Sequence, residues 1–363
     1  MWTFYNPVDV HAGCGSLAAL PRLLGARRAI LIAFPEATGL GLVERIRDLL
    51  GERLAAVETD VRPNPDVAWL APMYERLWRD HPEVECIVAL GGGSVIDCAK
   101  VMLTRPATGR FDELQALLEG APPDPASTLR HRRLLAIPTT AGTGSEVTPW
   151  ATVWDQARAR KLSLQLPWTW PQAAIVDAEL MLSLPHAATL ASGLDALSHA
   201  LESLWNVHRN PVSASLAVSA VRSILATLPA LLAKPHSRDL RERLATAALQ
   251  AGLAFSNTRT ALAHSLSYDI TLQHGTPHGI ACSFSLPRIM RLAAGRDAEL
   301  DALLRSAFDA GHIDEAIDTL SAFLQDLGVS VDPASYGIAE ADWSARIAQA
   351  LAGARGRNFI AAA

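Results

Sequence analysis

The sequence predicts an α/β N-terminal domain with a parallel, Rossmann-like sheet, followed by an all-α C-terminal domain. The chain has 363 residues, and at about 100–200 residues per domain this length suggests two domains. In the first half, short apolar runs of strand length alternate with segments of helical spacing, which favours a parallel sheet covered on both faces. From about Ala187 onward the chain is rich in Ala and Leu and gives few strand signals, which predicts helices alone.

Four apolar runs in the first half have the length of buried strands: residues 29–34, 86–90, 134–137 and 174–176. Helical spacing covers residues 43–50, and in the second half residues 189–205, 212–233, 239–256 and 259–272. An apolar segment, residues 95–103, follows a glycine turn after the second strand candidate. We expect the boundary near Pro185, with domains of residues 1–185 and 186–363. The Pro-rich stretch 121–125 is expected to be a surface loop rather than a linker.

Charge and composition argue against several classes of protein. The formal net charge of −5 provides no basic field for nucleic acid, and the basic run 130–133 is expected to be a solvated loop. Arg222 and Lys234 interrupt the Ala- and Leu-rich stretches, so we expect no membrane span. The start of the chain lacks the pattern of a signal peptide, and the four cysteines include no CxxC pair, so a cytoplasmic location is expected.

A glycine-rich segment, GGGSVIDCAK at residues 91–100, directly follows a predicted strand. Consecutive glycines let the backbone approach an anion closely. The helix that follows directs its free N–H groups and its positive dipole end at the same place, which is typical of a diphosphate site. The pattern is neither GxGxxG nor a P-loop, and a tight strand-to-helix turn without a ligand is the alternative.

A second loop, PTTAGTGSEV at residues 138–147, also follows a predicted strand. Its hydroxyl groups and exposed N–H groups can hold phosphate and ribose oxygens, although a polar loop without a ligand has the same composition. Ligands of open α/β sheets gather at the carboxyl ends of the strands. Two such loops after two strands therefore favour a nucleotide site.

Three histidines and one aspartate in the second half have the residue types of a metal site. Asp195 and His199 are four residues apart and share one face of a predicted helix, where they need a partner or pair with each other as core residues. His264 lies on another predicted helix, and His278 lies in a Pro/Gly turn. Three imidazoles and one carboxylate suit Zn²⁺ or Fe²⁺ and leave an open position for a substrate oxygen.

Taken together, these motifs resemble the iron-containing (group III) alcohol dehydrogenase family over nearly the whole chain, including Asn64, Lys161, Asp177 and Glu202. The resemblance implies an NAD(P)H-binding α/β domain, a helical domain that holds one divalent metal, Fe²⁺ or Zn²⁺, and a catalytic cleft between them. It further implies a small aldehyde or alcohol substrate and a homodimer. The implied metal ligands are Asp195, His199, His264 and His278, and the implied cofactor contacts are Asn64, Gly92, Gly93, Ser94, Asp97, Thr139, Thr140, Ser145 and Lys161.

Two departures from the family pattern bear on the chemistry. Members commonly carry a histidine four residues after the third metal ligand, and here that residue is Tyr268. A phenol can donate a proton, which makes Tyr268 a candidate catalytic residue, and His274 is a possible substitute. After the first strand, Phe34 replaces the aspartate of many NAD-preferring relatives, while Glu36 follows closely. The choice between NADH and NADPH therefore stays open.

Short stretches around residues 267–268 and 277–282 look like one branch of the family, the phosphonoacetaldehyde reductases of phosphonate biosynthesis. This likeness implies reduction of phosphonoacetaldehyde to 2-hydroxyethylphosphonate. A phosphonate needs arginine, lysine or helix N-termini nearby. Arg259, five residues before His264, is the candidate substrate residue, with Arg209 and Arg288 as others. Each of the three is also compatible with an ordinary surface position.

Several rival functions stay open at this point. A general short-chain alcohol dehydrogenase for neutral aldehydes has the same motifs. Glycerol dehydrogenase-like and dehydroquinate synthase-like enzymes have a different set of metal ligands, so the GLDALSHA helix at residues 193–200 argues against them. A metal- or nucleotide-binding relative that has lost turnover is compatible with Tyr268, and an assembly protein is a third class.

Overall fold

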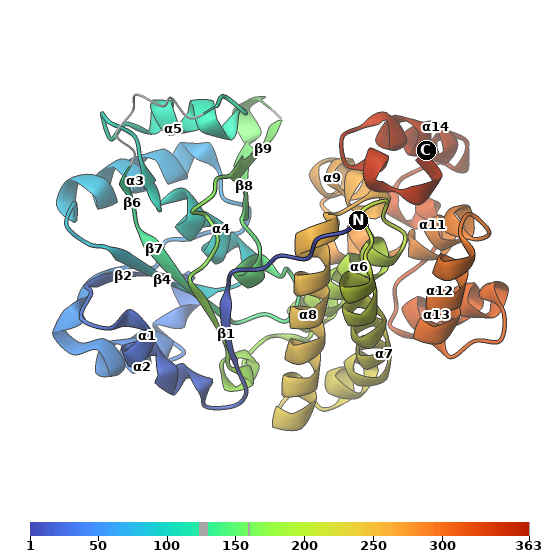
Figure 1. Ribbon diagram of the computed structural model, residues 1–363, viewed down its shortest axis with the longest axis horizontal. Helices are drawn as coiled ribbons and strands as arrows, with labels where there is room; N and C mark the ends of the chain where they lie inside the picture. The colour runs from blue at the N-terminus through green and yellow to red at the C-terminus, as the bar shows by residue number, and fades with distance from the viewer. Residues whose placement is uncertain (123–129, 159, 363) are drawn as a thin grey trace. The chain divides into compact units, whose positions relative to one another are not determined.

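The computed structural model of the chain describes residues 1–122, 130–158 and 160–362, and these form two compact units (Figure 1). The α/β unit comprises Pro7–Thr140 and Ser145–Ser183, and the helical unit comprises Met1–Asn6, Ala141–Gly144 and Leu184–Ala363. The predicted fold class, a parallel-sheet α/β part followed by a helical part, is confirmed. Which residues fold as independent domains stays a prediction. Residues 123–125 of the Pro-rich stretch lie outside the described residues.

The α/β unit is built on a sheet of six strands among the described residues, and every strand pairing in it is parallel. Its central strands are continuous apolar runs, because helices cover both of their faces. The strand order is β1-β10-β7-β4-β2-β3. The strands are β1 (Asp9–Ala12), β2 (Ala29–Ala33), β3 (Leu54–Glu58), β4 (Cys86–Gly91), β7 (Arg133–Pro138) and β10 (Ala173–Val176).

Alternation along the strands directs side chains into two hydrophobic cores, one on each face of the sheet. Ile30 and Ile32 of β2 contribute to the core that contains residues of α3, α4 and α5. Leu31 and Ala33 contribute to the core on the other face, with residues of α1 and α2. These helices are α1 (Leu20–Leu24), α2 (Leu42–Leu50), α3 (Val67–Asp80), α4 (Gly93–Val101) and α5 (Phe111–Leu118).

The strand order creates a switch point between β2 and β4. From β2 the chain continues to β3 on one side, and it then returns to the other side of β2 for β4, β7 and β10. The carboxyl ends of the two strands at such a reversal flank the crevice in which doubly wound sheets bind their ligands. Phe34 follows β2 and Gly92 follows β4 at this edge. The fold therefore brings the glycine-rich segment to the position where a nucleotide is expected.

Two antiparallel pairs complete the α/β unit: β5 (Thr104–Arg105) with β6 (Arg130–His131), and β8 (Trp150–Asp155) with β9 (Arg160–Gln165). The expectation that the basic run 130–133 is a solvated loop is wrong, because Arg130 and His131 form β6, Arg133 begins β7, and the exposed fraction of Arg132 is 1%. The Arg132 guanidinium lies 3.6 Å from the ring centroid of Trp78 and donates hydrogen bonds to the backbone carbonyls of Leu77, His81 and Val84.

The helical unit has a core of three long helices, α6 (His186–Leu204), α7 (Pro211–Ala233) and α8 (Arg238–Thr258), which contact one another pairwise. The predicted helix at 259–272 begins only at Leu262, because Arg259 ends α8 with a positive φ of 68°. The remaining helices are α9 (Leu262–His274), α10 (His278–Ser283), α11 (Leu286–Ala293), α12 (Ala298–Phe308), α13 (Ile313–Asp326) and α14 (Glu340–Ala352).

Helix α7 is long and apolar enough to cross a membrane by length and composition. One such helix does not indicate a membrane protein, because core helices of soluble proteins meet the same criterion. Helix α7 contacts α6, α8 and α12. The Arg222 guanidinium, near the middle of α7, donates a hydrogen bond to the backbone carbonyl of Ser306. Both features are those of a helix packed inside a globular unit.

Replacement of Arg132 by alanine is expected to destabilise the α/β unit. The change removes the cation–π contact with Trp78 and one hydrogen bond to each of three backbone carbonyls, and the Leu77 and His81 carbonyls keep a backbone N–H donor. The free energy of unfolding in urea should fall by at least about 2 kcal/mol. The matched control is Arg133→Ala, because Arg133 is the next residue of the same run and is exposed. Equal stability of the two variants would contradict this account of the buried guanidinium.

Candidate metal centre and cofactor loops

Helix α6 places three ionisable side chains in the interior of the helical unit. Asp195, His199 and Glu202 fall at intervals of four and three residues, so they share one face of the helix. Asp195 is 4% exposed, His199 5% and Glu202 0%. Burying such groups is unfavourable unless each finds a hydrogen-bond partner or a counter-ion. The other buried residues of α6 are apolar or carry hydroxyl groups, so further ionic partners come from neighbouring helices.

Glu202 supplies the partner that orients His264 on α9. A Glu202 carboxylate oxygen lies 2.6 Å from Nδ1 of His264, and the other accepts a hydrogen bond from the His264 backbone N–H. The carboxylate therefore fixes the proton on Nδ1 and leaves the Nε2 lone pair free, which is how protein carboxylates prepare histidine ligands for metals. His264 is 3% exposed.

Helix α10 carries His278 and Cys282 into the same region. The predicted Pro/Gly turn at His278 is wrong in detail, because His278 is the first residue of this short helix. His278 and Cys282 are one helical turn apart and lie on one face. Helix α10 packs closely on α6, since a Cβ atom at Gly279 would lie only 1.8 Å from the Ala191 carbonyl oxygen.

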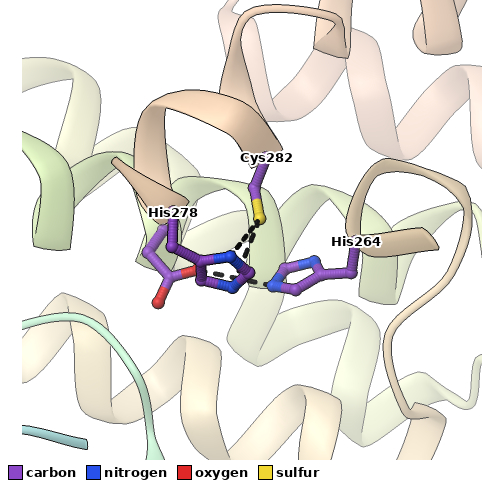
Figure 2. A group of neighbouring side chains, drawn as sticks. His264, His278 and Cys282 are labelled. Carbon is purple, nitrogen blue, oxygen red and sulfur yellow. Dashed lines mark hydrogen bonds and ion pairs between the residues drawn. The ribbon is translucent and has the colours of Figure 1, made fainter. Parts of the chain in front are cut away.

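The side chains of Asp195, His264, His278 and Cys282 converge on one point. One ligand atom from each lies within 4.8 Å of the corresponding atom of every other. Figure 2 shows the His264 and His278 rings and the Cys282 thiol directed toward one another. Cys282 Sγ lies 3.5 Å from His278 Nε2, and His264 Nε2 lies 3.4 Å from Asp195 Oδ1. We call these four residues the α6–α9–α10 cluster.

His199 lies beside the α6–α9–α10 cluster. Its Nε2 is 3.8 Å from Asp195 Oδ1. Its ring stacks on that of His264 at 4.6 Å between centroids and on that of Phe255 at 4.1 Å. The structure thus brings all four sequence-predicted metal ligands into one neighbourhood, and it adds Cys282.

Three buried polar atoms in this neighbourhood have no hydrogen-bond partner: Asp195 Oδ1, His199 Nδ1 and His264 Nε2. Unpaired buried groups of this kind are costly and rare. The distance of 3.4 Å between Asp195 Oδ1 and His264 Nε2 matches the separation of about 3.4 Å that oxygen and nitrogen ligands adopt around a tetrahedral zinc ion. The residues present therefore fit a divalent metal.

The electrostatics of the cluster favour negative charge on two of its ligands. Burial opposes ionisation of Asp195, but the imidazoles of His199 and His264 hold the pKa of that carboxyl well below its usual range. Burial raises the pKa of Cys282, and the His264 and His278 imidazoles outweigh this effect and lower the pKa to about 7. Burial lowers the pKa of His199 to about 4. Burial opposes protonation of His264, but Cys282, Glu202 and Asp195 outweigh this effect and hold the pKa of His264 well above its usual range. A bound metal would take the place of that proton, because metal ligands are carboxylates, thiolates and neutral imidazoles.

Tyr268 lies next to the cluster, whereas the other two predicted residues of the helical unit do not contact it. The Tyr268 ring is nearly parallel to that of His278, with 6.2 Å between centroids, and the Arg355 guanidinium lies 4.7 Å above the Tyr268 centroid. His274 is exposed at the last position of α9, and Arg259 is exposed at the end of α8. Arg209 is paired with Asp297, and Arg288 with Glu340.

In the α/β unit, the glycine-rich segment forms the turn from β4 into α4. Gly92 is the N-cap and Gly93 the first residue of the helix. The Ser94 hydroxyl accepts a hydrogen bond from the backbone N–H of Asn64, which has a positive φ of 58°. A Cβ atom at Gly92 would lie 3.2 Å from the Thr140 methyl group. Both predicted loops therefore meet where the adjacent strands β4 and β7 end.

Asp97, Ser145 and Lys100 form a buried network behind these loops. Asp97 accepts hydrogen bonds from the Ser145 hydroxyl and the Thr152 backbone N–H. The Lys100 ammonium donates to the Ser145 hydroxyl and to the Trp150 carbonyl, and burial lowers its pKa to about 8 against the opposing effect of Asp97. This network ties α4 to the second loop. Thr139 is buried at the end of β7, and Lys161 on β9 lies 5.5 Å from the Trp154 ring centroid.

Sequence reasoning assigned no role to Cys282, Glu202 or Arg355. Cys282 could have been found from its spacing of four residues from His278, but that spacing has meaning only if the segment is helical. Glu202 carries a comparable signal, a buried carboxylate three residues after His199 on an apolar helix. Arg355 is distant in sequence from all other candidate residues, so only the fold reveals its contact with Tyr268.

Comparisons with known proteins agree with this arrangement. The sequence profile of iron-containing alcohol dehydrogenase matches residues 7–178, and the profile of the C-terminal part of the Fe-containing alcohol dehydrogenase family matches residues 189–362. An NAD-dependent methanol dehydrogenase from Bacillus methanolicus is 30% identical over 94% of this chain and 91% of its own length. Together the two profiles extend over both units.

Two further similar proteins have names that specify an aldehyde. A phosphonoacetaldehyde reductase from Streptomyces viridochromogenes is 35% identical over 65% of this chain and 59% of its own length. The crystal structure of sulfoacetaldehyde reductase from Bifidobacterium kashiwanohense in complex with NAD⁺ superposes with a TM-score of 0.88 at 27% identity, covering 99% of this chain and 94% of that one. Both of these names denote a short aldehyde with an anionic head.

Replacement of Gly279 by alanine is expected to displace α10, because the added methyl group would overlap the Ala191 carbonyl oxygen. Overpacking of this kind should lower the free energy of unfolding by about 1–3 kcal/mol. The matched control is Gly311→Ala, since a Cβ atom there would meet only the flexible end of Glu315 at 3.4 Å. Urea unfolding measures both variants, and an unchanged stability of Gly279→Ala would contradict the close packing of α10 on α6.

Proposed function

The chain belongs to the iron-containing alcohol dehydrogenase family, and we propose that it is a metal-dependent, NAD(P)H-linked reductase that converts phosphonoacetaldehyde to 2-hydroxyethylphosphonate. The observation that carries the proposal is the α6–α9–α10 cluster, in which four ligand atoms converge and two of them, Asp195 Oδ1 and His264 Nε2, are buried without a hydrogen-bond partner among the described residues. The similarity to a phosphonoacetaldehyde reductase and to a sulfoacetaldehyde reductase supports a short aldehyde with a tetrahedral anionic head.

In this proposal Asp195, His199, His264 and His278 hold one divalent metal, Fe²⁺ or Zn²⁺. When bound, the metal acts as a Lewis acid that polarises the substrate carbonyl and stabilises the negative charge that develops on its oxygen. The chain prepares the ligands in advance. Glu202 keeps the His264 proton on Nδ1, and the packing of Gly279 on Ala191 sets the position of His278.

Reduction of an aldehyde adds a hydride to the carbonyl carbon and a proton to the oxygen, so a proton donor is required. We assign this role to the Tyr268 hydroxyl, because the Tyr268 ring is held parallel to that of His278 and beneath Arg355. His274 is the second candidate. Its exposure at the end of α9 suits an exchange of protons with solvent better than direct contact with substrate.

The α/β unit would bind the cofactor at the switch point of its sheet. The free N–H groups at the start of α4 suit a diphosphate, with Gly92, Gly93 and Ser94 closest to it. The Asp97–Ser145 hydrogen bond supports the shape of this site from behind. The remaining proposed contacts are Asn64, Thr139, Thr140 and Lys161. Similar proteins include an NAD-dependent and an NADPH-dependent enzyme, so the proposal covers both cofactors.

The anionic head of the substrate requires a cation near the cluster. Arg355 is the better placed of two candidates, since its guanidinium contacts the ring of Tyr268 and that ring neighbours His278. Arg259 is the candidate from the sequence, and its exposed side chain remains available to a ligand. Both belong to the helical unit, as does the cluster.

The aldehyde assay described below also distinguishes two other functions. The first is a general alcohol dehydrogenase for neutral short aldehydes, and the second is a metal- or nucleotide-binding relative without turnover. A role in phosphonate biosynthesis, a homodimer and a cytoplasmic location are also part of the proposal. The cytoplasmic location is supported by the four free cysteines, Cys14, Cys86, Cys98 and Cys282.

Steady-state oxidation of NADH and NADPH by the zinc- or iron-loaded protein tests the substrate. We expect kcat/KM for phosphonoacetaldehyde to exceed that for propionaldehyde by about a hundredfold, which corresponds to about 2.7 kcal/mol of additional transition-state binding. Arg355→Ala should raise KM for the phosphonate far more than KM for propionaldehyde, because the lost contact with Tyr268 affects both aldehydes alike. Arg259→Ala is the matched comparison.

The outcomes separate the alternatives. Turnover of neutral aldehydes alone would contradict the phosphonate substrate and leave a general alcohol dehydrogenase. A loss with Arg259→Ala but not with Arg355→Ala would move the anion site to the end of α8. Metal binding without turnover of any aldehyde would favour a relative that has lost catalysis.

Removal of the Glu202 carboxylate tests how the metal is held. Glu202→Ala should weaken Zn²⁺ binding by about 10–100-fold, because His264 then loses the group that orients it. Glu202→Gln should lose less, since its amide oxygen can still accept a hydrogen bond from the His264 Nδ1–H group. Competition with a chromophoric chelator measures the affinities, and Asp269→Asn, an exposed carboxylate of α9, is the control. Equal affinities of Glu202→Ala and the control would contradict the role of Glu202.

A further inference from the structure

We propose that the Cys282 thiolate is itself a ligand of the metal in the α6–α9–α10 cluster. The inference rests on the proposed metal site and makes Cys282 the fourth ligand of a tetrahedral set with Asp195, His264 and His278, in place of His199, whose ligand atoms are not part of that set. The family resemblance does not include this sulfur donor. It starts from the position of the thiol. Cys282 is fully buried, and its Sγ is one of four ligand atoms that all lie within 4.8 Å of one another.

The distances in the cluster fit a sulfur ligand. Bonds of about 2.3 Å to sulfur and about 2.0–2.1 Å to an imidazole nitrogen, at a tetrahedral angle, separate those two atoms by about 3.5 Å. Cys282 Sγ lies 3.5 Å from His278 Nε2. The two residues are on consecutive turns of α10, so one short helix presents both donors from the same face (Figure 2).

The neighbours of Cys282 distinguish it from the other buried cysteines. Cys98 Sγ contacts the Met73 sulfur at 3.9 Å, and Cys86 Sγ lies 3.6 Å from the Ile87 carbonyl oxygen, within the apolar cores of the α/β unit. Cys282 instead faces imidazoles and a carboxylate. Asp195 Oδ1 and His264 Nε2 are buried and have no hydrogen-bond partner, and both atoms face the same point as the thiol. A cation at that point would satisfy these atoms and the thiolate together, with release of the thiol proton.

A thiolate ligand changes which metals the site prefers. Sulfur is a soft donor that favours Zn²⁺ over harder ions such as Mn²⁺, which prefer oxygen ligands. Replacement of the sulfur by a hydroxyl should therefore weaken Zn²⁺ binding at least about tenfold and Mn²⁺ binding much less. The ratio of the two affinities reports on the donor atom, whereas a general loosening of the site would weaken both ions alike.

Cobalt(II) substitution provides a direct spectroscopic test. Wild-type protein loaded with Co²⁺ is expected to show an intense sulfur-to-cobalt charge-transfer band in the near ultraviolet. Cys282→Ser should lose this band while it still binds Co²⁺, and Cys14→Ser, which alters an exposed cysteine, should keep it. A wild-type protein that binds Co²⁺ stoichiometrically without the band would overturn the sulfur ligand and leave the proposed reductase intact.

A second measurement needs no variant and guards against misfolding of Cys282→Ser. Zinc K-edge X-ray absorption of the wild-type holoprotein should require one sulfur scatterer at about 2.3 Å. A first shell of nitrogen and oxygen alone would refute the proposal. Failure of the wild type to bind Zn²⁺ or Co²⁺ at all would overturn both this inference and the metal-dependent function, so the two failures are distinguishable.

Discussion

The central constraint on this protein is the burial of an ionised carboxylate among imidazoles in the helical unit. Asp195 and His264 are almost fully buried, and each presents an atom without a hydrogen-bond partner to the same point. Such groups are costly to bury unless a counter-charge compensates them. A divalent cation satisfies this requirement, and three helices converge so that their side chains meet there. The orientation of His264 by Glu202 and the close packing of α10 on α6 follow from the same requirement.

The α/β unit meets a different demand, the recognition of an anion by backbone groups. In a parallel sheet, a reversal of the strand order, here between β2 and β4, leaves a crevice at the carboxyl ends of those strands. The glycine-rich turn opens α4 at this edge, so the helix N-terminus is accessible to a phosphate without a basic side chain. Ser145 is hydrogen-bonded to both Asp97 and Lys100, and these bonds rigidify the loops around the crevice.

Much of this architecture could be predicted from the sequence, because it depends on local patterns. The four predicted strands appear as β2, β4, β7 and β10, within one or two residues at each end. The long helices of the second half follow the spacing of their apolar residues. The sequence does not predict β1, β3, the β5–β6 pair or the β8–β9 hairpin. Polar residues interrupt β1 and β9, and β3 is a short run with two alanines, which gives a weak strand signal. The sequence also places Arg132 in solvent, although Trp78, distant in sequence, covers it.

The candidate site shows the same division between local and long-range information. Asp195 and His199 could be paired from their spacing on one helix, and His264 and His278 from their residue types. Cys282 could not be added, because its spacing from His278 has meaning only once the Pro/Gly segment is seen to be helical. The contact of Arg355 with Tyr268 joins residues from distant parts of the chain and is visible only in the fold. Residues 141–144 lie in the middle of the second phosphate-type loop, yet they belong to the helical unit, where Gly144 approaches Gly252 too closely for any side chain.

The most direct test of the central claim is anomalous diffraction from crystals of the zinc-loaded wild-type protein, with data collected on both sides of the zinc edge. One strong anomalous peak is expected within about 2.0–2.4 Å of the ligand atoms of Asp195, His264 and His278. A peak at another position, or no peak in a protein shown to be folded and supplied with excess zinc, would contradict that claim.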